Sequence, residues 1–191
     1  MDFIIKFMYI LFCKIICRVE YVNEEKKNLE GKAVLCANHI SYFDVFGIYF
    51  NNKNCSAMAK AELFKWKPFA KLLNYAGVFP IKRGEKDARS LIHAVNCIKD
   101  DKSDRLIIFP EGTRLKKGKI PKAKTGAVYI AMKAGVPIIP IKITRKANRS
   151  FFTTYIYTYG DPIYYDLERT KDKDYIKNKS DELMNTILNI K

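Results

Sequence analysis

From about residue 33 onward, the chain alternates short apolar runs with longer stretches in which apolar residues recur every three or four positions. Short apolar runs are typical of buried strands, and the longer amphipathic stretches are typical of the helices that connect them. We therefore predict an α/β fold with a mixed, mostly parallel sheet flanked by helices. Functional residues gather at strand ends in such folds. The expected strands are residues 33–37, 55–59, 78–81, 105–109, 136–144 and 153–159.

The same pattern predicts helices between the strands. Residues 85–101 form one half-buried helix, with His93 on its solvent side. Its inward positions are expected to be Ala88, Leu91, Ile92, Val95 and Ile98. A second helix covers residues 124–135 and is terminated by Gly135, and a closing helix is expected to begin at a Ser180 cap.

The first residues of the chain are apolar from Phe3 to Cys17, interrupted by Lys6 and Lys14. This run falls short of the roughly 20 apolar residues that a membrane-spanning helix needs. We expect residues 1–19 to form an interfacial membrane-attachment helix and residues 20–191 to form a single α/β domain. An ordinary core helix is the main alternative. A signal peptide is disfavoured because the run contains lysines and lacks a small-residue cleavage site.

The formal net charge of +15 is concentrated in residues 51–150, which carry 23 basic and seven acidic side chains. Such a field attracts phosphate groups on nucleic acids, on lipid head groups or on small anionic substrates. The five cysteines are odd in number and lack the spacing of a zinc site, so we expect buried thiols in a reducing compartment. With only two histidines, we expect no histidine-rich metal centre.

One of these histidines, His39, follows the first expected strand and precedes Asp44 by five residues. Residues Ser41 to Asp44 resemble a capping box, which would start a helix at Ser41 and leave Asn38 and His39 on the turn before it. The imidazole could then fold back onto the Asp44 carboxylate. A carboxylate on one ring nitrogen leaves the other free to accept a proton from an alcohol, as a general base does. The alternative is a turn histidine that satisfies a backbone carbonyl.

Four ordered stretches change the balance between these two interpretations. They are Asn38-His39 with Asp44, residues 77–83, the hexapeptide FPEGTR at residues 109–114, and VPIIP at residues 136–140. Together they resemble the four motifs of the glycerolipid acyltransferases, and most closely those of the 1-acyl-sn-glycerol-3-phosphate acyltransferases. The resemblance runs from about residue 20 to residue 165. The first and third motifs are the specific ones.

The resemblance implies a glycerol-3-phosphate acyltransferase-like fold and an activity. The activity is direct transfer of a fatty acyl group from acyl-CoA or acyl-acyl carrier protein to the sn-2 hydroxyl of 1-acyl-sn-glycerol 3-phosphate, giving phosphatidic acid. It implies no permanently bound cofactor, no metal, and a location on the cytoplasmic face of the cell membrane. Acyl carrier protein is a possible protein partner. The acceptor could instead be glycerol 3-phosphate or another lysolipid.

The matched motifs also suggest roles for individual residues. Arg83 and Arg114 can supply fork-shaped donors to a substrate phosphate. Glu111 either orients one of these arginines or accepts from a glycerol oxygen. Gly112 permits close backbone approach, and Lys124 with Gly126 opens a helix whose amino end favours anions. The remaining candidates in the matched motifs are Thr113 for the phosphate, with Asn38 and Lys82 in support. For each basic residue, a solvated surface charge is the alternative.

Two other classes of protein explain the sequence less well. A serine esterase is disfavoured because the chain has no G-x-S-x-G elbow. A basic lipid- or nucleic-acid-binding module would fit the charge, but the chain has no recognisable helix-turn-helix or RNA-binding signature, and such a module leaves His39 and Asp44 unexplained. Nucleic acid is therefore not an expected partner.

Overall fold

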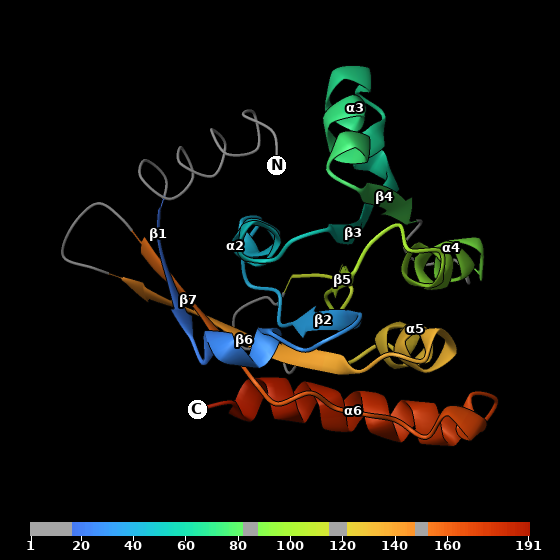
Figure 1. Cartoon of the computed structure of the whole chain (residues 1–191). Coiled ribbons are helices and arrows are strands. Elements are labelled where there is room, and N and C mark those ends of the chain that lie inside the picture. The colour runs from blue at the N-terminus through green and yellow to red at the C-terminus, as the bar shows by residue number, and fades with distance from the viewer. Residues whose placement is uncertain (1–16, 82–87, 115–121, 148–152) are drawn as a thin grey trace.

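A seven-stranded mixed sheet forms the centre of the described chain in the computed structural model, which describes residues 17–81, 88–114, 122–147 and 153–191 (Figure 1). Its strand order is β1-β7-β6-β2-β5-β3-β4. Strands β6 and β7 pair antiparallel, and all other neighbouring strands pair parallel, which confirms the mixed, mostly parallel sheet. The strands are β1 (Cys17–Val22), β2 (Ala33–Ala37), β3 (Cys55–Lys60), β4 (Val78–Ile81), β5 (Arg105–Ile108), β6 (Ile138–Ala147) and β7 (Thr153–Tyr159).

Helices cover the two faces of the sheet unequally. Helix α2 lies on one face, whereas α4, α5 and α6 lie on the other, and α3 projects away from the sheet (Figure 1). The α-helices are α2 (Asp44–Asn51), α3 (Lys67–Tyr75), α4 (Ala88–Lys99), α5 (Gly126–Ala134) and α6 (Lys173–Asn189). The short 3₁₀ helices are η2 (Glu24–Lys27), η3 (Ala61–Phe64) and η4 (Leu167–Arg169).

Strand β2 explains how the two layers are held together. Each of its residues is buried, because successive side chains point to opposite faces and both faces are covered. Val34 and Cys36 pack toward α4, α5 and α6, whereas Leu35 and Ala37 pack toward α2. The residues that follow β2 therefore leave the sheet from a fixed, fully packed base.

Helix α2 approaches the sheet closely at Gly47. A Cβ atom at this position would lie 2.1 Å from Cζ of the fully buried Tyr157 on β7. No side chain larger than hydrogen fits there without displacing one of the two elements. The glycine therefore sets the distance between α2, which begins with Asp44, and the sheet.

The expected leader helix is wrong at its carboxyl end. Residues Cys17–Val22 form strand β1, which pairs in parallel with β7 and alternates buried and exposed side chains. The helix expected over residues 1–19 is therefore wrong for residues 17–19. The prediction for residues 1–16 falls outside the described residues. In residues 17–81, 88–114, 122–147 and 153–191, no helix combines the length and apolar character needed to cross a bilayer.

The closing helix begins earlier than expected. Asp172 is the cap of α6 and accepts from the Tyr175 backbone N–H, at 2.9 Å. Ser180 instead lies buried in the middle of the helix, and its hydroxyl donates to the Ile176 carbonyl, at 2.7 Å. Ser180 is not a cap because its hydroxyl bonds back to the preceding turn.

Helix α4 confirms the expected helix and the exposed position of His93, with one exception on its apolar face. Ile92 was expected to face inward but is 58% exposed. Leu91, Val95 and Ile98 face the core as expected, and Ala94 and Cys97 join them there. Gly135 has the left-handed conformation, with φ of 72°, that was expected at the end of α5. Strands β2, β4 and β7 match their expected ranges residue for residue.

Candidate active site

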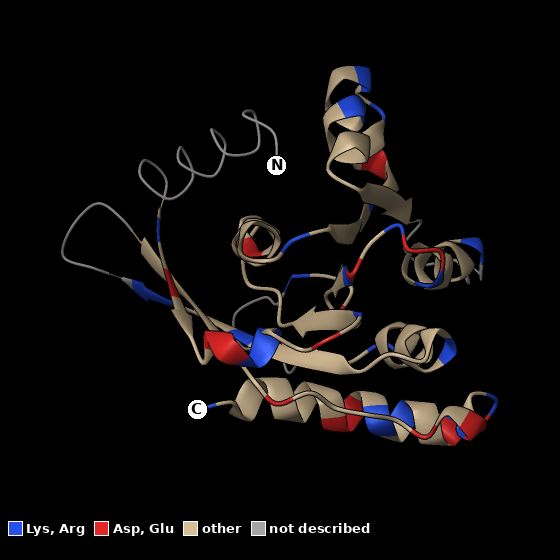
Figure 2. Ribbon diagram, viewed as in Figure 1, with Lys and Arg blue, Asp and Glu red and all other residues tan. Residues whose placement is uncertain are grey.

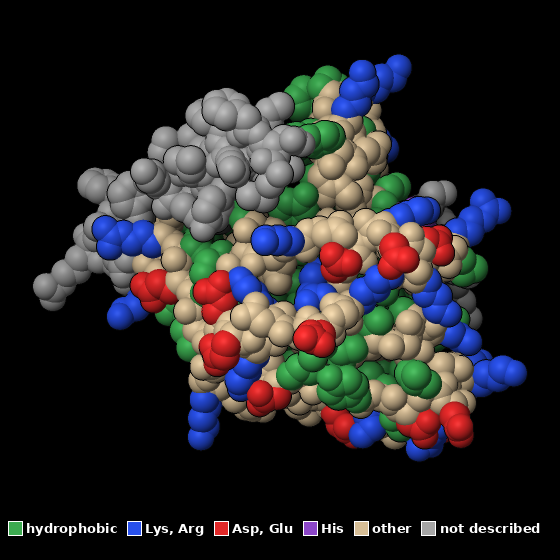
Figure 3. Space-filling model, viewed as in Figure 1, with side chains coloured by type: hydrophobic (Ala, Val, Ile, Leu, Met, Phe, Trp, Pro, Cys, Tyr) green, Lys and Arg blue, Asp and Glu red, His purple; other side chains and the backbone are tan. Residues whose placement is uncertain are grey.

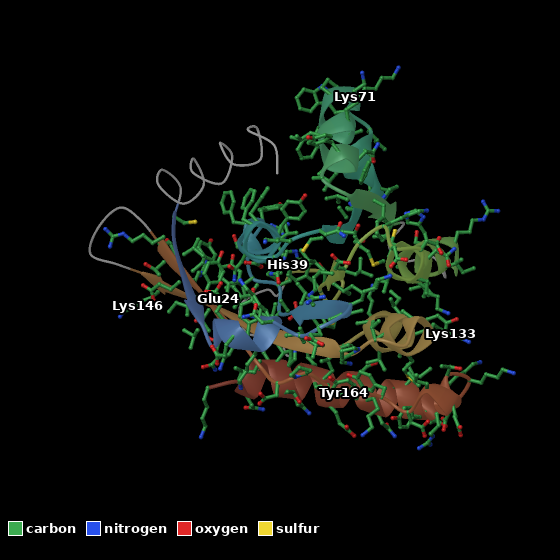
Figure 4. The ribbon with its side chains drawn as sticks, viewed as in Figure 1. Glu24, His39, Lys71, Lys133, Lys146 and Tyr164 are labelled. Carbon is green, nitrogen blue, oxygen red and sulfur yellow. The ribbon has the colours of Figure 1, made fainter. Side chains whose placement is uncertain are left out.

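The candidate site lies at the carboxyl ends of β2 and β5, which are neighbours in the sheet. Their parallel register places Cys36 beside Ile108, so His39 and Glu111 each follow three residues beyond a paired position. His39 lies beside α2, near the middle of the molecule (Figure 4). The two most specific sequence motifs thus meet at one edge of the sheet, as the α/β arrangement predicts.

His39 and Asp44 are in contact, as the sequence predicted. The distance from His39 Nδ1 to Asp44 Oδ2 is 2.8 Å. An ionised carboxylate can only accept, so Nδ1 carries the proton and Nε2 keeps its lone pair. The His39 side chain is 14% exposed, so the ring is neither sealed in the interior nor open to bulk water on all sides.

Asp44 is held in place by the turn that precedes it. Its Oδ2 atom also accepts from the backbone N–H groups of Ile40, at 2.6 Å, and Ser41, at 2.7 Å. These bonds orient the carboxylate toward the turn that carries His39. They also stabilise its negative charge through three donors.

The expected helix start at Ser41 is wrong. Helix α2 begins at Asp44, and the Ser41 hydroxyl accepts from the backbone N–H of Phe43, at 3.2 Å, in a tight turn. Only half of the capping box is present. The Asp44 carboxylate accepts from the Ser41 backbone N–H, but the Ser41 hydroxyl accepts from the Phe43 N–H and not from that of Asp44. Tyr155 on β7 donates to the Ser41 hydroxyl, at 3.0 Å, and so ties this turn to the sheet.

Phe109 fixes the plane of the His39 ring. The two rings are stacked, with centroids 4.2 Å apart and an interplanar angle of 20°. Phe109 directly follows β5, so its position depends on the same strand that carries Glu111. Two sides of the imidazole are thereby restrained, one by a carboxylate and one by an aromatic face.

The Asn38 side chain extends the hydrogen bonding between β2 and β6 by one position. Its side chain donates to the Ile143 carbonyl, at 2.9 Å, and accepts from the Ile143 N–H, at 2.6 Å. The paired part of β2 ends at Ala37, opposite Ile141. The Asn38 amide therefore satisfies the next backbone groups of β6 while its own backbone turns away, and this brings His39 out of the sheet.

Glu111 contacts His39 through the backbone. The His39 N–H donates to Glu111 Oε2, at 3.2 Å, and Glu111 is only 5% exposed. Its other oxygen, Oε1, is buried without a hydrogen-bond partner among the described residues. The pKa of Glu111 is raised to about 7. Burial is the main cause, the bond from the His39 N–H opposes the rise, and the charge of Asp44 adds to it. Of the two roles suggested for Glu111, the pairing with an arginine is not found among the described residues, and the contact with a glycerol oxygen stays a prediction.

Gly112 makes room for Lys124. Gly112 has a left-handed backbone, with φ of 66°, and a Cβ there would come within 2.9 Å of Lys124 Nζ. The Lys124 N–H donates to the Pro110 carbonyl, at 2.8 Å, which fixes the start of the segment leading into α5. Lys124 and Gly126 thus place a cation and a helix amino end beside the turn after β5, as the sequence suggested.

Arg114 reaches the other side of this turn. Its guanidinium carbon lies 3.3 Å above the centroid of the Tyr42 ring, and Tyr42 is 72% exposed. This contact joins the FPEGTR segment to the turn that carries His39. Thr113 is exposed. Lys82 and Arg83 lie outside the described residues, which end at Ile81 on that side of the sheet.

A model of the acyltransferase family matches residues 18–144. This range covers most of the chain and includes every residue of the site described above except Tyr155. The chain belongs to the acyltransferase family. The matched range begins within β1 and ends within β6, so it spans both strand ends that carry the site.

Two curated acyltransferases illustrate the similarity. A chloroplastic 1-acyl-sn-glycerol-3-phosphate acyltransferase of Brassica napus is 33% identical over 125 residues, which cover 63% of this chain and 35% of the relative. The human 1-acyl-sn-glycerol-3-phosphate acyltransferase beta is 30% identical over 134 residues, which cover 63% and 46% of the two chains. The chain thus spans between a third and a half of the length of these relatives.

A solved acyltransferase structure shares the fold. The 1-acyl-sn-glycerophosphate (LPA) acyltransferase PlsC from Thermotoga maritima superposes with a TM-score of 0.73 at 23% identity. The superposition covers 97% of this chain and 77% of that chain. This similarity supports the α/β architecture derived above.

Three side chains of the candidate site were not foreseen as parts of it. They are Phe109 on the His39 ring, Tyr155 on Ser41, and Tyr42 beneath Arg114. Phe109 had a sequence signal, since it stands first in FPEGTR and is the last residue of the strand expected over residues 105–109. Tyr155 had none, because it meets Ser41 only when β7 is in place.

Proposed function

We propose that this chain transfers a fatty acyl group from an acyl thioester to the sn-2 hydroxyl of 1-acyl-sn-glycerol 3-phosphate, forming phosphatidic acid. The single observation that carries the proposal is the contact between His39 and Asp44 at the carboxyl end of β2. The names of the curated relatives support the acceptor. The donor is the thioester of coenzyme A or of acyl carrier protein.

The reaction needs a base because a glycerol hydroxyl is too weakly acidic to attack a thioester unaided. His39 Nε2 takes the hydroxyl proton while the oxygen forms a bond to the thioester carbonyl carbon. Asp44 stabilises the resulting imidazolium through Nδ1. When the carbon–sulfur bond breaks, the proton on Nε2 passes to the leaving thiolate, which departs as a thiol and returns His39 to its starting state.

The acceptor phosphate is placed at the basic side of the site. Arg114 and Lys124 flank the turn that contains Gly112, and both lie within the segment that joins β5 to α5. In this proposal they hold the phosphate dianion, with Arg83 contributing from the segment after β4. Holding the phosphate fixes the distance between the hydroxyl and Nε2, which is the main requirement for fast transfer.

The reaction is proposed to take place at the cytoplasmic face of the membrane, where both lysolipid and product reside. Attachment through the apolar residues that precede β1 is part of this proposal. The exposed basic residues of the central part of the chain would face the anionic lipid surface.

The chain offers a matched test, because its two histidines differ in position. His39→Ala should lower kcat by about 10²- to 10⁴-fold, since it removes the general base. His93→Ala is the control, because His93 is exposed on α4 and contacts Phe79 rather than the site. Both variants are assayed with purified protein, with circular dichroism and thermal melting to check that each is folded.

The assay offers lysophosphatidic acid, glycerol 3-phosphate and a zwitterionic lysolipid, each with acyl-CoA and acyl-acyl carrier protein. The proposal expects the highest kcat/KM for lysophosphatidic acid. Turnover that survives in folded His39→Ala would reject the base assignment. A higher kcat/KM for glycerol 3-phosphate would make glycerol 3-phosphate the acceptor and would not affect the assignment of His39 as the base.

A further inference from the structure

The segment between β3 and β4 stands apart from the rest of the molecule. Residues 61–75, here called the α3 arm, comprise η3 and α3 and project from the sheet (Figure 1). Lys71 lies far out on this projection (Figure 4). Every residue of the arm is described, and none of those in η3 or α3 is buried. The arm therefore contributes no residue to either core layer.

The composition of the arm does not fit its exposure. Three large apolar side chains are open to solvent, namely Leu63 (45% exposed), Trp66 (68%) and Tyr75 (56%). Helix α5, which is also nine residues long, buries five of its side chains. Helix α3 begins immediately after Trp66, and the Trp66 ring stacks on Phe69 at 6.3 Å between centroids. An apolar surface of this kind on a helix without buried residues indicates a binding surface.

The charges on the arm favour one kind of partner. Among residues 60–75, four are lysines and only Glu62 is acidic. Lys60 pairs with Glu62 at 3.0 Å. The other three lysines, at positions 65, 67 and 71, pair with no acidic side chain in the described part of the chain. Figure 2 marks the positions of basic residues along the ribbon of the arm, and Figure 3 shows hydrophobic and basic side chains together at this end of the molecule.

We propose that the α3 arm inserts Leu63, Trp66 and Tyr75 into the surface of an anionic phospholipid bilayer, with its lysines at the level of the head groups. Tryptophan and tyrosine favour the membrane–water interface because one part of each ring is apolar and the other is polar. Lysine side chains lie along apolar surface while their ammonium groups reach the lipid phosphates. An acidic protein partner would satisfy the lysines but not the interfacial preference of the aromatic rings.

The position of the arm makes such contact useful to the site. The arm begins directly after Lys60, at the carboxyl end of β3, and parallel β5 lies between β3 and β2. The arm therefore leaves the sheet from the same edge at which His39 lies. A bilayer that binds the arm lies on the side of the molecule from which an amphiphilic acceptor would enter. This consequence rests on the proposed function, whereas the binding itself does not.

The chain carries its own probe for this contact, because Trp66 is its only tryptophan. The full-length protein is titrated with phosphatidylcholine vesicles, with and without phosphatidylglycerol, and Trp66 emission is recorded. Insertion moves emission to shorter wavelength and makes it sensitive to brominated lipid acyl chains, with a larger effect when phosphatidylglycerol is present. The measurement needs no turnover, so its result is independent of whether the chain transfers acyl groups.

Two sets of variants separate the apolar and charged parts of the proposal. Leu63→Ser should lower the vesicle partition coefficient by about tenfold, because a buried leucine side chain is lost from the interface. Leu167→Ser is the matched control, because Leu167 is 51% exposed but lies in η4, beside the start of α6. Replacing Lys65, Lys67 and Lys71 together by glutamine should abolish the preference for phosphatidylglycerol.

Two outcomes would overturn the proposal. One is co-sedimentation of the chain with vesicles while Trp66 emission and its response to brominated lipid stay unchanged, which would place binding on another surface. The other is a shift of emission to shorter wavelength that depends on protein concentration without vesicles, which would make the arm a contact between copies of this chain.

Discussion

Two carboxylates lie next to His39, and their surroundings differ. Asp44 Oδ2 is bonded by the His39 ring and by two backbone N–H groups, whereas Glu111 accepts from a single backbone N–H. The anion of Glu111 therefore has much less stabilisation for a comparable degree of burial. Within one site, Asp44 is suited to hold charge opposite an imidazolium, and Glu111 is suited to carry a proton near neutral pH.

We predict that Glu111 makes folding stability depend on pH. Its pKa is about 7 in the folded chain, against an ordinary value of 4.5, so the folded state binds more protons between these pH values. The free energy of unfolding should therefore fall as pH rises from about 4.5 to about 7 and then level off, by on the order of 3 kcal/mol. Glu111→Gln should remove this decrease while keeping an acceptor for the His39 N–H.

The free energy of unfolding is measured with denaturant for the wild type and for Glu111→Gln at about pH 4.5 and about pH 8. The difference between the two proteins at each pH gives the contribution of the Glu111 carboxyl group. The glutamine variant should gain stability relative to the wild type at the higher pH. If the free energy of unfolding changes equally in both proteins between the two pH values, the pKa of Glu111 is not raised in the folded chain.

The residues of the site divide according to how far their contacts reach along the chain. The contact of His39 with Asp44 was predictable because it spans five residues and depends on one local turn. The contacts of Asn38 with Ile143 and of Tyr155 with Ser41 each span more than 100 residues. Such contacts depend on the strand order of the sheet, which the local pattern of apolar residues does not specify.

At the scale of elements, the distance between α2 and the sheet controls the site. Gly47 lies one turn after Asp44 and faces Tyr157, and the Tyr21 hydroxyl donates to the Gly47 carbonyl, at 2.8 Å. A shift of α2 away from β7 would therefore move the Asp44 carboxylate. Such a shift would weaken its contact with His39 Nδ1.

We predict that Gly47→Ala costs about 1–3 kcal/mol of stability, because the new methyl group overlaps the Tyr157 ring. Turnover should fall as well, since α2 must move. Gly126→Ala is the control for stability, because a Cβ at that position meets Leu91 at an ordinary 3.5 Å. Chemical denaturation is measured for both variants, and kcat is measured for Gly47→Ala against the wild type.

The double variant Gly47→Ala with Tyr157→Leu tests the cause. Its loss of stability should be smaller than the sum of the two single losses, because the smaller side chain leaves room for the methyl group. Strictly additive losses, or a single Gly47→Ala variant as stable as the wild type, would contradict the role given to this contact.

The helices and strands could be predicted from the sequence where an apolar run is clearly separated from its neighbours by polar or glycine residues. Strands 33–37 and 78–81 are short apolar runs bounded by polar or glycine residues, and both were placed correctly. Strand β1 was missed because its alternation of buried and exposed residues directly follows the apolar opening of the chain. The beginning of α6 was missed because Ser180 looks like a cap in sequence, whereas Asp172 performs that role.

At the scale of the whole molecule, the net charge of +15 acts on any anionic substrate. The basic residues are distributed over several elements, including the α3 arm and β6 (Figure 2). Charges arranged in this way attract an anion over distances of about a Debye length, which is about 8 Å at physiological salt. The attraction acts on the approach of the substrate rather than on the chemical step.

We predict that added salt lowers kcat/KM for lysophosphatidic acid by several-fold while kcat changes little, because screening weakens the encounter. A zwitterionic lysolipid serves as the control and should show a smaller dependence. Steady-state rates are measured across a series of sodium chloride concentrations with both acceptors. Equal salt dependence for the two acceptors would assign the effect to the protein rather than to attraction of the phosphate.

Strand β1 has a further consequence for how the chain is assembled. Among the described strands it pairs with β7 alone, and the register places Cys17 beside Thr153. During synthesis, β1 leaves the ribosome well before β7 and finds this neighbour only after residues 153–159 have emerged. Pairing across so long a separation is slow. Strand β1 is therefore added late to the described sheet, and a ribosome stalled before residue 153 would hold a nascent chain in which β1 lacks the neighbour it has in the folded sheet.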